Sequence, residues 1–160
     1  MDLENKTVEK DTMENVCCAG NSAPDILSTV TSSLGLEKKD VRQLPALTLA
    51  YLGDCIYELV IRTMLVERGI MHVSELSKAS VGYVKATAQK DLFQKIESLL
   101  SEEEIAAFKR GRNVKSSSCA KNASITDYRI ATGFEALMGY LYVQGRFDRI
   151  LELVKKGIEK

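Results

Sequence analysis

The stretch that most constrains the fold runs from Leu44 to Arg68 and reads LPALTLAYLGDCIYELVIRTMLVER. Its apolar residues fall on most sides of a helix, with Pro45 suited to the start and Gly69 to the end. Such a helix must be covered by other elements, so we expect it to be buried at the centre of a domain. Gly53 lowers its helix propensity by about 1 kcal/mol relative to alanine. We therefore expect either a close approach to the backbone at Gly53 or no room there for a side chain.

The rest of the chain also favours helices. No segment alternates convincingly with a period of two, and the 160 residues include only two prolines. These features predict an all-α domain. Beyond the central helix, we expect helices over residues 26–36, over 75–100 with a soft interruption at Gly82 and a cap at Ser74, from Ser101 to about 113, from Ser124 or Thr126 to about 144, and over 146–156 with Gly157 as the stop.

The domain organisation is simple. Residues 1–22 are polar without an apolar period, which predicts a flexible N-terminal tail, and residues 23–160 are expected to form one domain. No run of about 18 apolar residues indicates a membrane span, and the N-terminus lacks an apolar signal core, so we expect a cytoplasmic protein. Four cysteines without a C-x-x-C pair, with a single histidine, leave little material for a zinc site.

Two acids stand among apolar neighbours on the expected helices, Asp54 and Glu135. Burying a carboxylate is unfavourable unless it is paired or binds a metal. A glycine lies close before each acid and would leave room for a ligand. Two crossing helices could bring the carboxylates together, and such oxygen ligands suit Mg²⁺ or Mn²⁺. The alternative is structural: Asp54 pairs with a basic residue, and Glu135 pairs with Arg129 or Lys121.

Charge is balanced over the whole chain, with 22 basic and 22 acidic residues, but it is unevenly distributed. Residues 105–122 contain five basic residues and no acid, a local pattern typical of contact with nucleic-acid phosphates. A basic helix end would explain the first three of them equally well. The five candidate RNA-binding residues are Lys109, Arg110, Arg112, Lys115 and Lys121.

Three motifs point to a known family. LAYLGDCIYE at residues 49–58 and TGFEALMGYLY at 132–142 resemble the two metal-binding helices of ribonuclease III domains in their Mini-ribonuclease III form, and KRGRN at 109–113 resembles another stretch of that form. The resemblance covers about residues 24–155. It implies the compact ribonuclease III endonuclease-domain fold and a homodimer that cleaves double-stranded RNA. Further implied are catalytic Mg²⁺ on Asp54 and Glu135, with Mn²⁺ as a substitute, and a ribosomal RNA precursor as substrate.

The sequence also departs from the longer ribonuclease III enzymes. These have further acids at the positions of Ala50 and Thr132, so the resemblance implies a leaner metal site here. We expect Glu58 to pair with Arg62 rather than support the site, and Asp127 to be a first-turn acid of its helix. Glu75 lies near the place of an accessory acid in the longer enzymes and could help hold a second metal, but we favour a first-turn acid there too. The missing acids motivate one alternative, a non-catalytic duplex-RNA-binding module. A helical protein-interaction domain is another. Binding and cleavage of duplex RNA, with and without Mg²⁺, separate the three.

Overall fold

The computed structural model describes residues 26–114 and 124–159. No strand occurs in this part of the chain, so the all-α prediction is confirmed. None of its helices is both long and apolar enough to cross a membrane. The expected tail over residues 1–22 lies outside the described residues. The helices are α1 (Ile26–Ser33), α2 (Ala46–Glu67), α3 (Val73–Val84), α4 (Ala86–Ile96), α5 (Glu102–Arg112), α6 (Ile125–Val143) and α7 (Phe147–Ile158), with 3-10 turns η1 (Val41–Gln43) and η2 (Glu97–Leu99).

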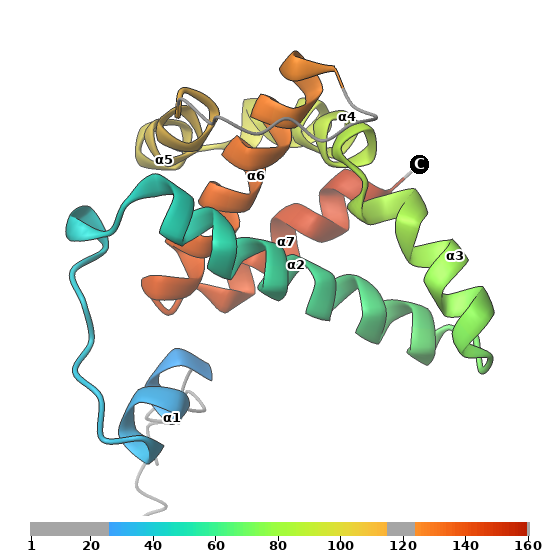
Figure 1. Cartoon of the computed structure of the whole chain (residues 1–160), viewed down its shortest axis with the longest axis horizontal. Helices are drawn as coiled ribbons and strands as arrows, with labels where there is room; N and C mark the ends of the chain where they lie inside the picture. Colours follow the sequence, from blue (N-terminus) through green and yellow to red (C-terminus); the bar gives the residue numbers. More distant parts are fainter. Residues whose placement is uncertain (1–25, 115–123, 160) are drawn as a thin grey trace, which may run out of the picture.

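Helices α2 and α6 cross at the centre, with α4, α5 and α7 arranged around α6 (Figure 1). Glycines allow the crossing. A Cβ atom on Gly53 would lie 1.8 Å from the carbonyl oxygen of Glu135, and one on Gly139 would lie 1.9 Å from that of Leu49. The close approach expected at Gly53 is confirmed, and the approaching group is a helix backbone. The expectation that these glycines leave room for a ligand is wrong, because helix α6 fills the space at Gly53 and the Phe108 ring fills it at Gly133.

The core forms around α6, which is buried on almost every side between Ala131 and Leu141. Aromatic rings join it to its neighbours. Tyr57 of α2 meets Phe134 of α6 edge to face, with ring centroids 5.0 Å apart. This all-round burial explains why the α6 segment shows no polar stripe in the sequence. The largest fully buried apolar side chains are Tyr57, Phe134, Leu49, Ile61, Ile96, Leu137, Met138, Leu141, Ile150 and Leu153.

Helix α2 has two faces, which corrects the expectation that it is buried all round. One face packs into the core through Leu49 and Ile61. The other is exposed, and Tyr51 on it keeps 79% of its surface in contact with solvent. Helix α2 crosses the front of the molecule in Figure 1, and none of the helices that the structure describes covers it there. Within residues 26–114 and 124–159, an apolar face of the central helix therefore remains exposed.

Two predicted helix starts are confirmed in detail. Ser101 caps α5 in a capping box: its hydroxyl accepts from the Glu104 N–H, and the Glu104 carboxylate accepts from the Ser101 N–H. Ser124 caps α6 by accepting from the Asp127 N–H. Asp127 is a first-turn acid as expected, and it also pairs with Lys90 of α4 at 3.0 Å.

Three predicted helix boundaries are wrong. Helix α3 begins at Val73 after His72, so Ser74 lies inside it. The break between α3 and α4 is at Lys85, whose backbone is extended, rather than at Gly82. Gly157 lies within α7, where a Cβ atom would come 2.3 Å from Leu92 Cγ. That glycine therefore serves the packing of α7 on α4 and does not end the helix.

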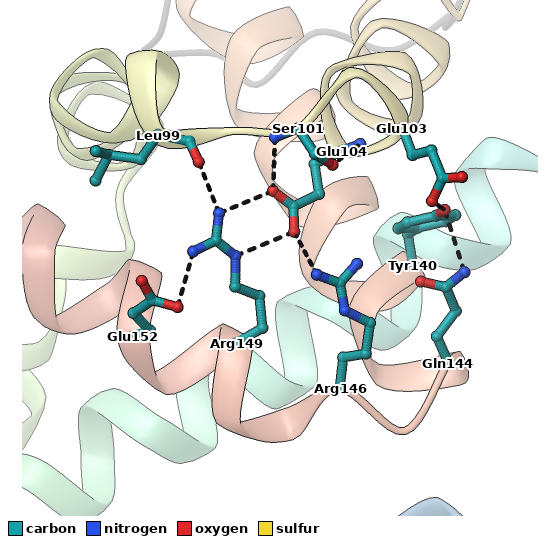
Figure 2. Close-up of polar contacts among 9 residues, drawn as sticks. All are labelled: Leu99, Ser101, Glu103, Glu104, Tyr140, Gln144, Arg146, Arg149 and Glu152. Atoms are coloured by element: carbon teal, nitrogen blue, oxygen red, sulfur yellow. Dashed lines mark hydrogen bonds and ion pairs between the residues drawn. The ribbon is translucent and has the colours of Figure 1, made fainter.

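A buried ion-pair cluster fastens α5 to α7 (Figure 2). The fully buried Glu104 carboxylate accepts from Arg146 Nη2 at 2.9 Å and from Arg149 Nε and Nη2 at 3.1 and 3.0 Å. Burial alone would raise the pKa of Glu104. Hydrogen bonds from Arg149 and the Ser101 backbone, together with both arginine charges, outweigh burial and lower the pKa. The negative charge of this glutamate is thus neutralised by groups of the chain itself.

Candidate functional site

The crossing of α2 and α6 brings the two candidate acids together. Gly53 packs directly against the backbone of Glu135, and Asp54 is the next residue along α2. The carboxylates are close enough for the negative charge of Asp54 to raise the pKa of Glu135. The meeting of two acids that the sequence suggested is therefore present in the structure.

Glu135 is a half-buried acid without a counter-charge. Loss of hydration and then the charge of Asp54 raise its pKa to about 7, and the side-chain amide of Gln89 lowers it only in part. Glu135 forms no ion pair with any described residue, and Arg129 is exposed to solvent, so the structural pairing with Arg129 is not found. Lys121, the other structural partner considered, lies outside the described residues.

Asp54 differs from its expected setting because its side chain is exposed. Partial desolvation and then the nearby charge of Glu58 raise the pKa of Asp54, while Arg62 acts in the opposite direction. Glu58 and Arg62 form the predicted ion pair one helical turn apart. Because Arg62 is engaged by Glu58, its charge offsets only part of the negative charge around Asp54.

The residues at the crossing fit a lean divalent-metal site. Within residues 26–114 and 124–159, no group of three His, Cys, Asp or Glu side chains could hold a metal ion. Ala50 is buried, and the Thr132 hydroxyl donates to the Tyr128 carbonyl of its own helix. Two carboxylates thus remain, with an excess of negative charge. Mg²⁺ usually binds through one or two carboxylates and keeps several waters, so Asp54 and Glu135 suit it better than an ion that needs four protein ligands.

Sequence reasoning missed Gln89, a third polar side chain at this site. Gln89 lies in the first turn of α4 and is only 1% exposed. Its Nε2 atom is buried and makes no hydrogen bond to any described residue. The signal was available, because Gln89 precedes Leu92 and Phe93 by three and four residues and so shares their core-facing side of the helix. A polar residue on such a face needs an explanation.

The predicted basic stretch is described only in part. Lys109 is exposed in the last turn of α5. Arg110 donates to the Leu44 carbonyl at 2.7 Å, and Arg112 lies over the Phe108 ring at 5.8 Å, so both also have structural roles. Lys115 and Lys121 lie outside the described residues. Sequence reasoning treated Arg129 only as an ion-pair partner, but it lines a pocket at the meeting of α5 and α6 with Arg112, Asn113, Thr126 and Ile130.

Comparisons with known proteins agree on one family. The Ribonuclease III domain family matches residues 47–146, a range that includes both candidate acids. Mini-ribonuclease 3 of Clostridium tetani is 48% identical over 119 residues, which cover 74% of this chain and 79% of that protein. Mini-ribonuclease 3 of Enterococcus faecalis is 47% identical over 124 residues, covering 76% and 94%. A crystal structure of a protein from Fusobacterium nucleatum is similar with a TM-score of 0.66 at 32% identity, covering 73% of this chain and 93% of that one.

Proposed function

This chain belongs to the ribonuclease III domain family, among its Mini-ribonuclease 3 members, and we propose that it cleaves double-stranded RNA with a divalent metal held by Asp54 and Glu135. One observation carries the assignment of the site. Glu135 is half-buried beside a second acid, its pKa is raised to about 7, and no described cation answers its charge. A bound divalent cation would supply the missing charge.

The two acids have complementary places in the proposed reaction. Asp54 is exposed and faces the solvent from which a duplex would approach. Glu135 sits deeper, where its surroundings strengthen electrostatic interactions with any bound cation. Mg²⁺ held there, or Mn²⁺ in its place, would make a water more acidic and stabilise negative charge on the phosphate during hydrolysis. The leaner set of ligands leaves more of the coordination shell to water and substrate.

Duplex RNA would be held by the basic residues beside this site. Lys109, Arg110 and Arg112 lie in the last turn of α5, and α5 packs against α6, the helix that carries Glu135. Duplex RNA is recognised mainly through its shape, phosphates and 2′-hydroxyls, which such side chains can contact. We include Lys115 and Lys121 in the proposed RNA-binding set on sequence grounds.

We propose a homodimer whose interface covers the exposed face of α2. Asp54 lies at the edge of this face, and most of the face is apolar. Helical periodicity defines its members. They are residues 47, 51, 54, 55, 58, 59, 62 and 66. Neighbouring apolar side chains that are exposed together on one face are typical of an interaction site. Sedimentation should give a dimer at micromolar concentration, and Tyr51→Glu together with Leu59→Glu should give a monomer. A wild-type monomer would contradict the proposal. The exposed apolar side chains of this face are Leu47, Tyr51, Leu59 and Val66.

Family resemblance extends the proposal to a ribosomal RNA precursor as the natural substrate, encountered in the cytoplasm. Composition and geometry do not select that RNA among duplexes, because the candidate contacts are to phosphates. Purified protein should therefore cleave generic duplex RNA, and a preference for one site in precursor RNA would support the narrower assignment.

The decisive experiment measures cleavage of duplex RNA with Mg²⁺ and with a chelator. Wild-type protein should cleave only with metal, and Asp54→Asn and Glu135→Gln should each abolish cleavage while the protein remains folded. Glu102→Gln is the matched control, since Glu102 is an exposed first-turn acid of α5, and this variant should cleave normally. Metal-independent binding without any cleavage by the wild type would instead identify a non-catalytic duplex-RNA-binding module, the alternative that the absence of acids at Ala50 and Thr132 favours.

A further inference from the structure

We propose that Gln89 is a positioning residue that donates a hydrogen bond from its Nε2 to the Glu135 carboxylate and so fixes which carboxylate oxygen faces the metal. This inference rests on the proposed function, because it assigns Glu135 to the metal. It adds a residue on α4 to a site otherwise built from α2 and α6.

The first support is an unsatisfied donor in the core. Gln89 is 1% exposed, and its Nε2 has no hydrogen-bond partner among the described residues. A buried donor without a partner destabilises a fold, and an apolar side chain of similar shape would avoid that loss. The glutamine therefore brings no evident benefit to the stability of the metal-free chain, which points to a role at the neighbouring carboxylate when metal is bound.

The second support is the place of the amide. The Gln89 side chain lies close enough to the Glu135 carboxyl to lower its pKa. The surrounding backbone is also held firmly: Lys90, the next residue, pairs with Asp127 of α6 at 3.0 Å, and Leu92 packs into the core against Gly157 of α7. The first turn of α4 is thus fastened to the helix that carries Glu135, so the amide cannot move far from it.

The chemistry of the two groups fits this role. An ionised carboxylate has about four acceptor sites on two oxygens, so Glu135 can accept from Gln89 through one oxygen and present the other beside Asp54. The reverse amide orientation would set two oxygens against each other. Hydrogen bonds from outer residues commonly orient metal-binding carboxylates, and removing them weakens metal binding or activity by about 10- to 100-fold.

The test compares Gln89→Met with Gln94→Met in the full chain. Methionine keeps the length of the side chain and removes the donor, and Gln94 is an exposed glutamine on the same helix. Titration calorimetry with Mn²⁺ alone should show at least about tenfold weaker binding for Gln89→Met and unchanged binding for Gln94→Met. The thermal midpoint of metal-free Gln89→Met should equal or exceed that of the wild type, because an unsatisfied buried donor has gone.

A second readout separates positioning from folding and RNA binding. The Mn²⁺ concentration for half-maximal cleavage should rise at least about tenfold in Gln89→Met, while its affinity for duplex RNA in chelator stays at the wild-type value. Gln89→Leu repeats the measurement with a different shape. Wild-type Mn²⁺ affinity in a folded Gln89→Met or Gln89→Leu protein would overturn the inference and leave the proposed function intact. Failure of the wild type itself to bind Mn²⁺ or cleave would overturn the proposed function, and the role of Gln89 with it.

Discussion

Glu104 at the contact of α5 with α7 and Glu135 at the crossing of α2 with α6 both lose hydration, yet their pKa values shift in opposite directions. Two guanidinium groups and a backbone N–H surround Glu104 and keep it ionised. Glu135 has instead a second acid, Asp54, and a single neutral amide, that of Gln89, which lowers its pKa only in part. Burial alone therefore does not distinguish a structural acid from a functional one. The charges placed around the acid make that distinction.

The two regions also differ in how far their charged and polar groups find partners within the chain, and so in stability. The Glu104 cluster is complete within the chain, since its oxygens accept four hydrogen bonds in all from Ser101, Arg146 and Arg149 (Figure 2). The Glu135 region is incomplete within the described chain, because both its negative charge and the Gln89 donor lack partners there. An unsatisfied region of this kind is less stable than it could be, and proteins accept such a loss where a site must bind something else.

The largest expected effect on stability comes from adding a side chain at Gly53, where α2 packs against the backbone of Glu135. In Gly53→Ala, the new Cβ would lie 1.8 Å from the Glu135 carbonyl oxygen, which is backbone and cannot turn aside. The loss in unfolding free energy should exceed the ~1–3 kcal/mol typical of an overpacked core. Gly82→Ala is the control, since it lies in α3 with nothing within 4 Å, and it should gain about 0.5–1 kcal/mol. Chemical denaturation measures both. Near-wild-type stability of Gly53→Ala would mean that the helices are not held at this crossing.

Removing each acid in turn tests the comparison directly. Glu104→Ala leaves two arginines without their buried partner and should lower the free energy of unfolding by about 3–5 kcal/mol. Glu135→Gln keeps the shape of the side chain and removes a negative charge that has no described counter-charge, so the metal-free protein should lose no stability at neutral pH. Cleavage should show the reverse order, with Glu135→Gln inactive and Glu104→Ala active at temperatures where it remains folded. Equal destabilisation by the two changes would show that Glu135 is also a structural acid.

The helices were predictable because their signals are local. Ser101 with Glu104 forms a capping box three residues apart, and Gly69 follows the end of α2, so neither needs the rest of the fold. Gly157 misled the prediction because the same residue type serves a helix end and a close helix contact. Only the tertiary position of Leu92 decides between them.

The candidate site was predictable in part for the same reason. Asp54 and Glu135 each interrupt an apolar helix, which is visible in the sequence. Their meeting depends on how α2 crosses α6, and the resemblance to a known family supplied that pairing. The sequence marks Gln89 as core-facing, but its place beside Glu135 and the place of Arg129 in the pocket come from packing. The extended backbone at Lys85 turns α4 towards α6, and α5 ends beside the start of α6. No local pattern specifies either event.

Glu135 and Glu104 should also make the free energy of unfolding depend on pH in opposite directions. The pKa of Glu135 is about 7 in the folded chain against an ordinary value of 4.5. Between these values the unfolded state releases the proton and the folded state keeps it, so metal-free stability falls as pH rises, by about 3 kcal/mol at most. The lowered pKa of Glu104 acts the other way: its contribution is present above the ordinary value and is lost as pH falls through its folded pKa.

Denaturation of the metal-free protein between pH 4 and 8 measures this contrast. Glu135→Gln should lack the decline between about pH 4.5 and 7, so its advantage over the wild type should grow across that range. Saturating Mn²⁺ should also suppress the decline, because metal binding holds Glu135 in its ionised form. A wild-type profile parallel to that of Glu135→Gln would mean that Glu135 is ionised across this range without help from a metal.

The smallest expected effect is on RNA binding, and it tests the same contrast on the positive side chains: some have an ion-pair partner and others have none among the described residues. Arg146 and Arg149 are engaged by Glu104, whereas Lys109 and Arg112 in the last turn of α5 face no carboxylate among the described residues. If these two contact phosphates, each lost contact should reduce the salt slope of duplex-RNA binding by a little under about one unit, because fewer counterions are released. The reduction should be the same for different duplex sequences, since phosphate contacts carry no sequence information.

The measurement is duplex-RNA affinity across a salt series for Lys109→Ala with Arg112→Ala, made in Asp54→Asn protein so that no cleavage occurs. Folding should change by only about 0.5–1 kcal/mol, mostly from the contact of Arg112 with the Phe108 ring. Lys155→Ala, an exposed lysine on α7, is the matched control and should leave the slope unchanged. An unchanged slope in the double variant would assign these residues to the end of α5 alone, and RNA contact would then have to lie on another face of the catalytic domain.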